Sequence, residues 1–391
     1  MTDPKHTALR AVHAELGANF TDFGGWDMPL KYGSELAEHR AVRSTAGLFD
    51  LSHMGEVRVT GADAAAFLDH ALVTVYSAMK VGKAKYGVIV DRTGHVLDDL
   101  ITYRISDDEF LVVPNAGNAA VVAAALTERA EEFRTGASGA GTATEAPSTP
   151  GADVTVRDES AGTSLVAVQG PASEAIVLAA LDAGVDPERV TGLGYYAWAP
   201  VVIAGVDVML ARTGYTGEDG FELYVPNEAA VTLWQALVAA GEGHELVPCG
   251  LAARDSLRLE AGMPLYGHEL TVETSPVDAG LGKMVERALE KKGDFFAREA
   301  LESFAGSTPA RVLVGLSSEG RRAAREGAAV MIDGAEVGVV TSGQPSPTLG
   351  HPIALAYLDT AHAEAGTAVS VDIRGKAHDF RVVDLPFYRR S

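Results

Sequence analysis

The sequence predicts an α+β fold made of two α+β subdomains and a small C-terminal β-barrel. Strands are followed by helices in the first part of the chain, and the same order of strand, turn and helix returns between residues 164 and 181. After Arg311 the pattern changes to short strands separated by turn residues. With 391 residues, 47% of them hydrophobic, the chain can bury a large core but is too long for a single compact one.

The first subdomain is predicted from alternating helical and strand patterns. Helical spacing predicts helices over residues 7–16 and 34–44, the second with a serine at its start. Further elements are a strand over 56–60, a helix over 62–72, a strand over 109–113 and an alanine-rich helix over 118–133. His53 is polar within an apolar stretch and is interpreted as a hydrogen-bonded structural histidine. The small, polar stretch 135–153 predicts a loop, and it lacks the Gly-Lys-Ser/Thr of a phosphate-binding loop.

An acidic hairpin over residues 86–104 is the unusual feature of this subdomain. Strand-forming residues flank turn formers at residues 91–94. Side chains alternate along a strand, so one of the adjacent Asp98 and Asp99 is expected to face water while the other points inward. A buried ionised carboxylate is costly unless it is used. The alternative is a strand end at which both aspartates are solvated.

The second subdomain begins with a strand over residues 164–168 and a helix that ends near 181. Residues 201–209 are expected to form one apolar strand, and the three glycines of residues 212–222 favour a loop wrapped around a ligand. A helix over residues 250–262 places Arg254 and Arg258 on one face, either as surface salt-bridge partners or as ligands for a dicarboxylate. The barrel is predicted from short strands over residues 312–316, 329–332, 337–340, 353–357, 369–373 and 379–383.

Composition excludes several classes of function. A net charge of −21 argues against affinity for nucleic acid or an anionic membrane. No apolar run is long enough for a membrane span, and the N-terminus lacks a signal-peptide layout, so a cytoplasmic protein is expected. The single cysteine, Cys249, is interpreted as a small core residue. The eleven histidines and one cysteine show no paired ligand spacing, so no metal is expected.

Seven motifs then point to a known family. The sequence resembles the aminomethyltransferases, the T proteins of the glycine cleavage system, across nearly its whole length; only the stretch 135–153 looks longer than the family usually has there. The motifs are FGGWDMP at 23–29, GLFDLSHMG at 47–55, LDDLI at 97–101, QGP at 169–171, RTGYTGEDG at 212–220, GLAARDSLRLEAG at 250–262, and TSG at 341–343 with SPTL at 346–349.

The resemblance implies a fold and a reaction. The fold has two folate-binding α+β subdomains (1–284) and a C-terminal β-barrel (285–391), three lobes around a central cavity. Tetrahydrofolate, as co-substrate, takes the methylene of an aminomethyl group on the lipoyl arm of the H protein. The products are 5,10-methylenetetrahydrofolate, ammonia and dihydrolipoyl H protein, and the P and L proteins are further components of the system.

The resemblance also assigns roles to single residues. Asp99 takes the catalytic role, Glu222 holds the amino-pyrimidine edge of the pterin, and Arg254 binds folate. The remaining folate-binding positions are Asn115, Tyr86, Tyr215, Met54, Tyr388 and Arg389. Because H proteins of the family are acidic, a basic patch is expected to receive one, and the densest candidate is Lys283, Arg287, Lys291 and Lys292. The alternative interpretation of this patch is a solvated helix face.

Two rival functions remain open at this point. The first keeps the fold but changes the one-carbon donor, as in tetrahydrofolate-dependent demethylases and the folate domains of dimethylglycine and sarcosine dehydrogenases. Those dehydrogenases carry a glycine-rich nucleotide fingerprint that this sequence lacks. The second is a non-enzymatic folate-binding protein of iron–sulphur maintenance. That branch has a Lys-Gly-Cys-Tyr-type motif, where residues 212–217 here read RTGYTG.

Overall fold

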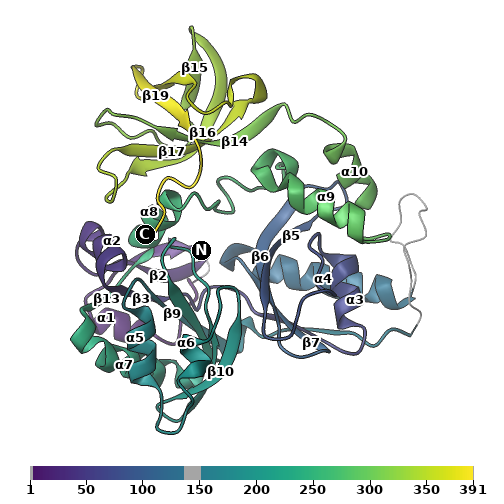
Figure 1. Ribbon diagram of the computed structural model, residues 1–391, viewed down its shortest axis with the longest axis vertical. Helices are drawn as coiled ribbons and strands as arrows, with labels where there is room; N and C mark the ends of the chain where they lie inside the picture. The colour runs from purple at the N-terminus through teal and green to yellow at the C-terminus, as the bar shows by residue number, and fades with distance from the viewer. Residues whose placement is uncertain (1–2, 136–150, 391) are drawn as a thin grey trace.

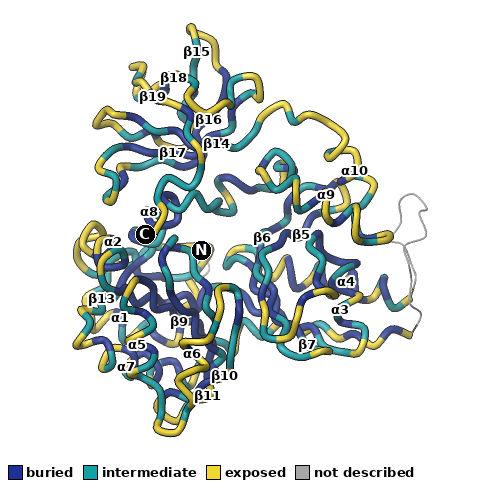
Figure 2. The backbone as a smooth tube through the Cα atoms, in the orientation of Figure 1, coloured by how far each residue is buried: buried dark blue, intermediate teal, exposed yellow. Residues whose placement is uncertain are grey.

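The computed structural model describes residues 3–135 and 151–390, which form three lobes (Figure 1). The strands at the centre of each lobe are buried, and the exposed segments are mostly loops and outer helix faces (Figure 2). The mixed α+β fold with a C-terminal barrel is therefore confirmed. Within the described residues, no helix combines the length and apolar character that crossing a membrane requires.

The first lobe is built on a five-stranded antiparallel sheet with the order β5-β6-β7-β4-β8. Its strands are β4 (Val57–Thr60), β5 (Ala84–Val90), β6 (Val96–Arg104), β7 (Glu109–Pro114) and β8 (Thr155–Asp158). Helices α3 (Ala64–Ala71) and α4 (Ala119–Thr135) pack on the sheet through Phe67, Leu126 and their apolar neighbours. The expected acidic hairpin is confirmed as β5 and β6. The loop predicted over 135–153 lies mostly outside the described residues.

The second lobe is built on a six-stranded sheet with the order β10-β11-β12-β9-β3-β13. The strands are β3 (Ala46–Asp50), β9 (Thr163–Gln169), β10 (Trp198–Ile203), β11 (Val206–Ala211), β12 (Gly220–Pro226) and β13 (Leu246–Pro248). Helices α1 (Arg10–Glu15), α5 (Ser173–Ala180), α6 (Glu188–Thr191) and α7 (Ala230–Gly241) accompany it, and a hairpin of β1 (Asn19–Phe23) and β2 (Trp26–Lys31) precedes it.

The single strand expected over residues 201–209 is wrong. The chain turns at Ala204 and Gly205, whose φ angles are +50° and +75°, and Ile203 pairs with Val206. Two consecutive positive φ angles are typical of the two-residue turns that match the twist of a hairpin. The apolar run therefore folds back on itself as β10 and β11.

The barrel is closed, with the strand order β14-β17-β16-β15-β18-β19. Its strands are β14 (Arg311–Ser317), β15 (Ala329–Ile332), β16 (Ala335–Pro345), β17 (Pro352–Asp359), β18 (Ala368–Asp372) and β19 (Ala377–Val383). Closure leaves no free sheet edge. All six strands predicted from turn spacing are confirmed.

Helices between the second sheet and the barrel connect the lobes. Helix α9 (Gly282–Lys291) follows the short π-helical segment η5 (Val277–Leu281). Helices α9 and α10 (Arg298–Ala305) pack on strands β5 and β6 of the first lobe through apolar residues that include Val285 and Leu301. The expected domain boundary at residues 284 and 285 falls within α9. By these contacts we propose that the division lies between α10 and β14.

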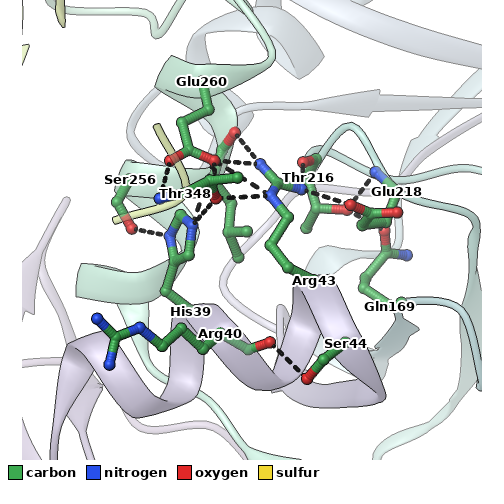
Figure 3. Close-up of polar contacts among 12 residues, drawn as sticks. His39, Arg40, Arg43, Ser44, Gln169, Thr216, Glu218, Ser256, Glu260 and Thr348 are labelled. Atoms are coloured by element: carbon green, nitrogen blue, oxygen red, sulfur yellow. Dashed lines mark hydrogen bonds and ion pairs between the residues drawn. The ribbon is translucent and has the colours of Figure 1, made fainter. Parts of the chain in front are cut away.

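Helices α2 (Glu35–Ser44) and α8 (Leu251–Glu260) carry a buried polar cluster that joins the second lobe to the barrel (Figure 3). Glu260 accepts hydrogen bonds from Arg43 at 2.7 Å and from Thr348, on the barrel side, at 2.7 Å. His39 lies 3.2 Å from the same carboxylate. Leu259 packs on Ile353 and Leu355 of the barrel. Helix α8 is thus held on two sides, which fixes the face of the helix that carries Arg254.

Candidate active site

A cavity of about 510 Å³ lies where the lobes meet. Strands β5 and β6 border it on one side, and the loop before β12 and helix α8 border it on the other. Leu313 of the barrel and Leu385 of the C-terminal segment also line it. Seven of the nine predicted site residues line this cavity: Met54, Tyr86, Asp99, Asn115, Tyr215, Glu222 and Arg254.

Asp99 is positioned by two neutral hydrogen-bond donors. Tyr86, on the adjacent strand β5, donates to Oδ2 at 3.1 Å, and the amide Nδ2 of Asn115 donates to Oδ1 at 2.7 Å. Asn115 follows β7, whose last residue pairs with Leu100 beside Asp99. Leu97 has no partner in the pairing of β5 with β6, so a bulge precedes the two aspartates. Bulges of this kind re-aim side chains next to active sites.

Asp98 does not face water, so the expectation of one solvated aspartate is wrong. Its side chain is fully buried on the opposite face of β6. It accepts hydrogen bonds from the backbone N–H and the amide of Asn115, both at 2.8 Å, and from the amide of Asn118 at 2.9 Å. The segment after β7 covers that face of the strand and supplies its donors. One asparagine side chain therefore contacts both carboxylates.

Burial governs the protonation of this pair. Loss of solvent raises the pKa of Asp99 to about 6, and the hydrogen bonds from Asn115 and Tyr86 offset part of that rise. Burial and the neighbouring charge of Asp99 raise the pKa of Asp98 to about 7. Near neutral pH the pair can hold or release a proton, which suits a group that takes part in proton transfer.

Glu222 is the second buried acid of the cavity. Thr213 donates to its Oε2, and Tyr103 lies 3.3 Å from the same oxygen. Burial raises the pKa of Glu222, and these hydrogen bonds and the charge of Arg254 oppose the rise. Both donors use Oε2, which leaves Oε1 without a hydrogen bond to any described residue.

Arg254 and Arg258 have different roles, although they lie on the same helix. Arg258 is 2% exposed and forms a structural network with Glu269 and Asp255, each at 2.9 Å. The guanidinium of Arg254 stacks on the ring of Tyr215, 4.6 Å from its centroid, and makes no hydrogen bond or ion pair with any described residue. Its guanidinium lines the cavity, where it can bind a carboxylate of a ligand.

Tyr388 and Arg389 lie away from this cavity. Tyr388 stacks on Arg43 at 4.0 Å and lines a separate pocket with Arg212 and Asp219. Arg389 is exposed. Their assignment as folate contacts remains a prediction.

His53 lies at the cavity, a position that the sequence did not indicate. It lines the cavity, stacks edge-on against Phe23, and its Nδ1 has no hydrogen-bond partner among the described residues. The prediction that His53 is a hydrogen-bonded structural histidine is therefore wrong at this nitrogen.

Tyr196, which also lines the cavity, has a φ of +56°. No pattern in the sequence distinguishes it from the neighbouring Tyr195.

The basic patch is only partly exposed. Lys283, Arg287 and Lys291 are exposed on α9, which begins directly after cavity-lining residues of η5. Lys292 instead donates to the backbone oxygen of Leu72 at 2.6 Å, and burial lowers its pKa to about 7. Lys292 therefore does not belong to the exposed basic patch.

In the part of the chain that is described, no group of three or more His, Cys, Asp or Glu side chains could hold a metal ion.

The chain is similar to known proteins over nearly its whole length. Residues 9–288 match the family model of the GCVT N-terminal domain, and residues 311–389 match that of the glycine cleavage T-protein C-terminal barrel domain. The aminomethyltransferase of Streptomyces avermitilis is 55% identical to this chain, over 99% of the chain and 98% of its own length. The aminomethyltransferase of Cutibacterium acnes is 53% identical over the full length of both. The crystal structure of glycine cleavage system aminomethyltransferase T from Bartonella henselae is 35% identical, covers 98% of both chains and has a TM-score of 0.86. The chain belongs to the glycine cleavage T-protein family of aminomethyltransferases.

Proposed function

We propose that this protein is the aminomethyltransferase of a glycine cleavage system and that Asp99 is its catalytic carboxylate. The observation that carries the proposal is a partly buried aspartate held by neutral donors in the cavity that also contains Glu222 and Arg254. Tetrahydrofolate is the co-substrate that accepts the one-carbon unit of the aminomethyl group.

The cavity residues fit a reduced folate. Glu222 is a carboxylate with a free oxygen, which suits the parallel N–H donors of an amino-pyrimidine. Arg254 carries an unpaired guanidinium for a ligand carboxylate, and Met54, Tyr86 and Tyr215 supply apolar and aromatic walls. Asp99 stabilises the positive charge that develops on the aminomethyl group as its carbon–sulphur bond breaks, because a fixed carboxylate acts strongly where water is excluded. It can also accept a proton during transfer.

Calorimetric titration with tetrahydrofolate tests the binding residues. Glu222→Gln and Arg254→Met should each weaken binding by about tenfold or more, the cost of losing a charge-assisted contact. The matched control is Arg40→Met, which removes an exposed arginine and should leave affinity unchanged. If the wild-type protein gave no heat and no thermal stabilisation with tetrahydrofolate while a divalent metal gave both, the site assignment would fail.

We also propose that the lipoylated H protein docks against the exposed basic residues of α9 and that the P and L proteins complete the system. Helix α9, which carries the patch, begins directly after the cavity-lining residues of η5, and this proximity supports delivery of a lipoyl arm from a protein bound there. Lys283→Glu combined with Arg287→Glu should raise the KM for aminomethyl-loaded H protein and leave folate affinity unchanged. The control reverses the exposed Arg374 and Lys376 of the barrel. An unchanged KM at low salt would remove the patch from the interface, and turnover with free sarcosine but not with H protein would favour a demethylase.

A further inference from the structure

A second pocket, outside the candidate active site, lies at the junction of the two α+β lobes. It has a volume of about 430 Å³ and is bordered by β4 and β7 of the first lobe and by β10, β11 and β12 of the second. Figure 1 shows β7 and β10 at this junction. Its walls are largely apolar and include Leu111, Trp198, Met209 and Tyr224. Tyr224 also lines the active-site cavity and separates the two spaces.

Glu56 lines this second pocket as a buried acid without a partner. Its side chain is 1% exposed, and neither carboxylate oxygen has a hydrogen-bond partner among the described residues. Arg58, the arginine of the pocket, is already engaged, because it donates to Glu109 at 2.7 Å and to Glu159 at 2.9 Å. A buried polar group that lacks a partner costs free energy and calls for an explanation.

The charges around Glu56 exclude an anionic occupant. Glu159 and Asp207 are the other acids that line the pocket, and the charge of Arg58 is shared between two carboxylates. Burial, with the charges of Asp158 and Glu159, raises the pKa of Glu56 well above its usual value. A cation with N–H donors would satisfy both free oxygens and reduce this repulsion.

We propose that the second pocket binds a small organic ammonium ion, with Glu56 accepting its N–H donors and the apolar walls packing against its alkyl part. The volume lies within the range of small-molecule sites. The rings of Trp198 and Tyr224 can contribute attraction to a cation. A bare metal ion needs several oxygen ligands, and the described residues offer no such group.

The proposal implies a proton balance. When the carboxyl of Glu56 is protonated, an alkylammonium ion binds to the carboxylate form and one proton leaves the Glu56 oxygen for solvent. Proton release makes the measured heat depend on the ionisation enthalpy of the buffer. Binding through Glu159 and Asp207 alone, the other acids of the pocket, would leave the measured heat independent of the buffer.

The test is calorimetric titration of the full-length protein with propylammonium chloride in two buffers of different ionisation enthalpy, at constant ionic strength. The wild-type protein should bind saturably with buffer-dependent heat. Glu56→Gln should weaken binding by about tenfold or more and abolish the buffer dependence. It should keep or raise the Tm, because the carboxyl has no partner to lose. Asp207→Asn, which removes an exposed carboxylate at the rim, should bind within about twofold of wild type.

Besides a heat of binding that is independent of buffer, three results would overturn the proposal. One is the absence of saturable binding to the wild-type protein. Another is unchanged affinity in Glu56→Gln. The third is equally tight binding of tetramethylammonium, a cation without N–H donors, because it would show charge attraction without recognition by the carboxylate.

Discussion

Two buried carboxylate clusters in this chain differ in the charge of their partners. Glu260 is surrounded by Arg43 and His39 together with hydroxyl donors (Figure 3). Burial alone raises its pKa, but the hydrogen bonds and charges of these partners lower it to about 2. Asp98 is as deeply buried as Glu260, whereas Asp99 is partly exposed to the cavity that it lines. Both receive neutral amide or phenol donors, and their pKa values rise to about 7 and about 6.

We propose that the difference separates a structural carboxylate, Glu260, from a reactive one, Asp99. Glu260 stays ionised and joins α2, α8 and the barrel segment that carries Thr348. Asp99 has no cation in hydrogen-bonding contact among the described residues, so its charge is available to a substrate cation. The identity of the partners, more than the depth of burial, therefore determines what each cluster does.

The largest expected effect is on turnover in Asp99→Asn. The substitution keeps the shape and removes the charge, so kcat should fall by roughly two to four orders of magnitude. Tetrahydrofolate affinity should change much less, because the carboxylate is needed most when positive charge develops. The control is Asp107→Asn, an exposed aspartate. Methylenetetrahydrofolate formation from aminomethyl-loaded H protein is the assay, and a loss below tenfold would deny Asp99 its role.

The next effect is on stability in Glu260→Gln. Glu260→Gln removes one of the two carboxylates that pair with Arg43, the other being Glu218 at 3.0 Å, and the loss of this buried charge should cost about 3 kcal/mol of unfolding free energy. Because the folded pKa is depressed, this stabilisation is present above about pH 4.5 and is lost as the pH falls toward 2. Urea unfolding measures it. Glu290→Gln, at an exposed pair with Lys291, is the control and should leave the unfolding free energy unchanged, because solvent screens that pair. A loss of turnover in folded Glu260→Gln would contradict a purely structural role.

A smaller effect is expected in Asp98→Asn. Three donors point at this carboxylate, and an asparagine offers them a single acceptor, so stability should fall by about 1–3 kcal/mol. The raised pKa of Asp98 means that its contribution is fully present below the unfolded pKa and declines as the pH rises toward 7. The stability gap between wild type and variant should therefore be larger at pH 5 than at pH 8. A gap that grows with pH would reverse this assignment.

Much of the fold could be predicted because local patterns agree with it. Turn spacing predicted the six barrel strands, and the motif match placed seven residues in one cavity. The sequence could not show that Asn115 contacts both aspartates, because that contact depends on the pairing of β6 with β7. Alternation alone placed one of the two aspartates in water, because it takes no account of the segment after β7 that covers Asp98. The turn at Ala204 and Gly205 was missed because apolar residues continue on both sides of it.

The pH dependence of kcat, in wild type and in Asn115→Ala, tests the central claim most directly. Turnover needs ionised Asp99, so wild-type kcat should rise with pH through an apparent pKa of about 6 that belongs to the coupled pair. Asn115→Ala removes hydrogen-bond donors that favour the ionised forms of the two aspartates, so the rise of kcat should move to higher pH in this variant. The loss of turnover should therefore be greater at pH 6.5 than at pH 8.5. Two results would contradict the account. One is a wild-type kcat that does not change between pH 5 and 8, and the other is a rise of kcat that occurs at the same pH in Asn115→Ala as in wild type.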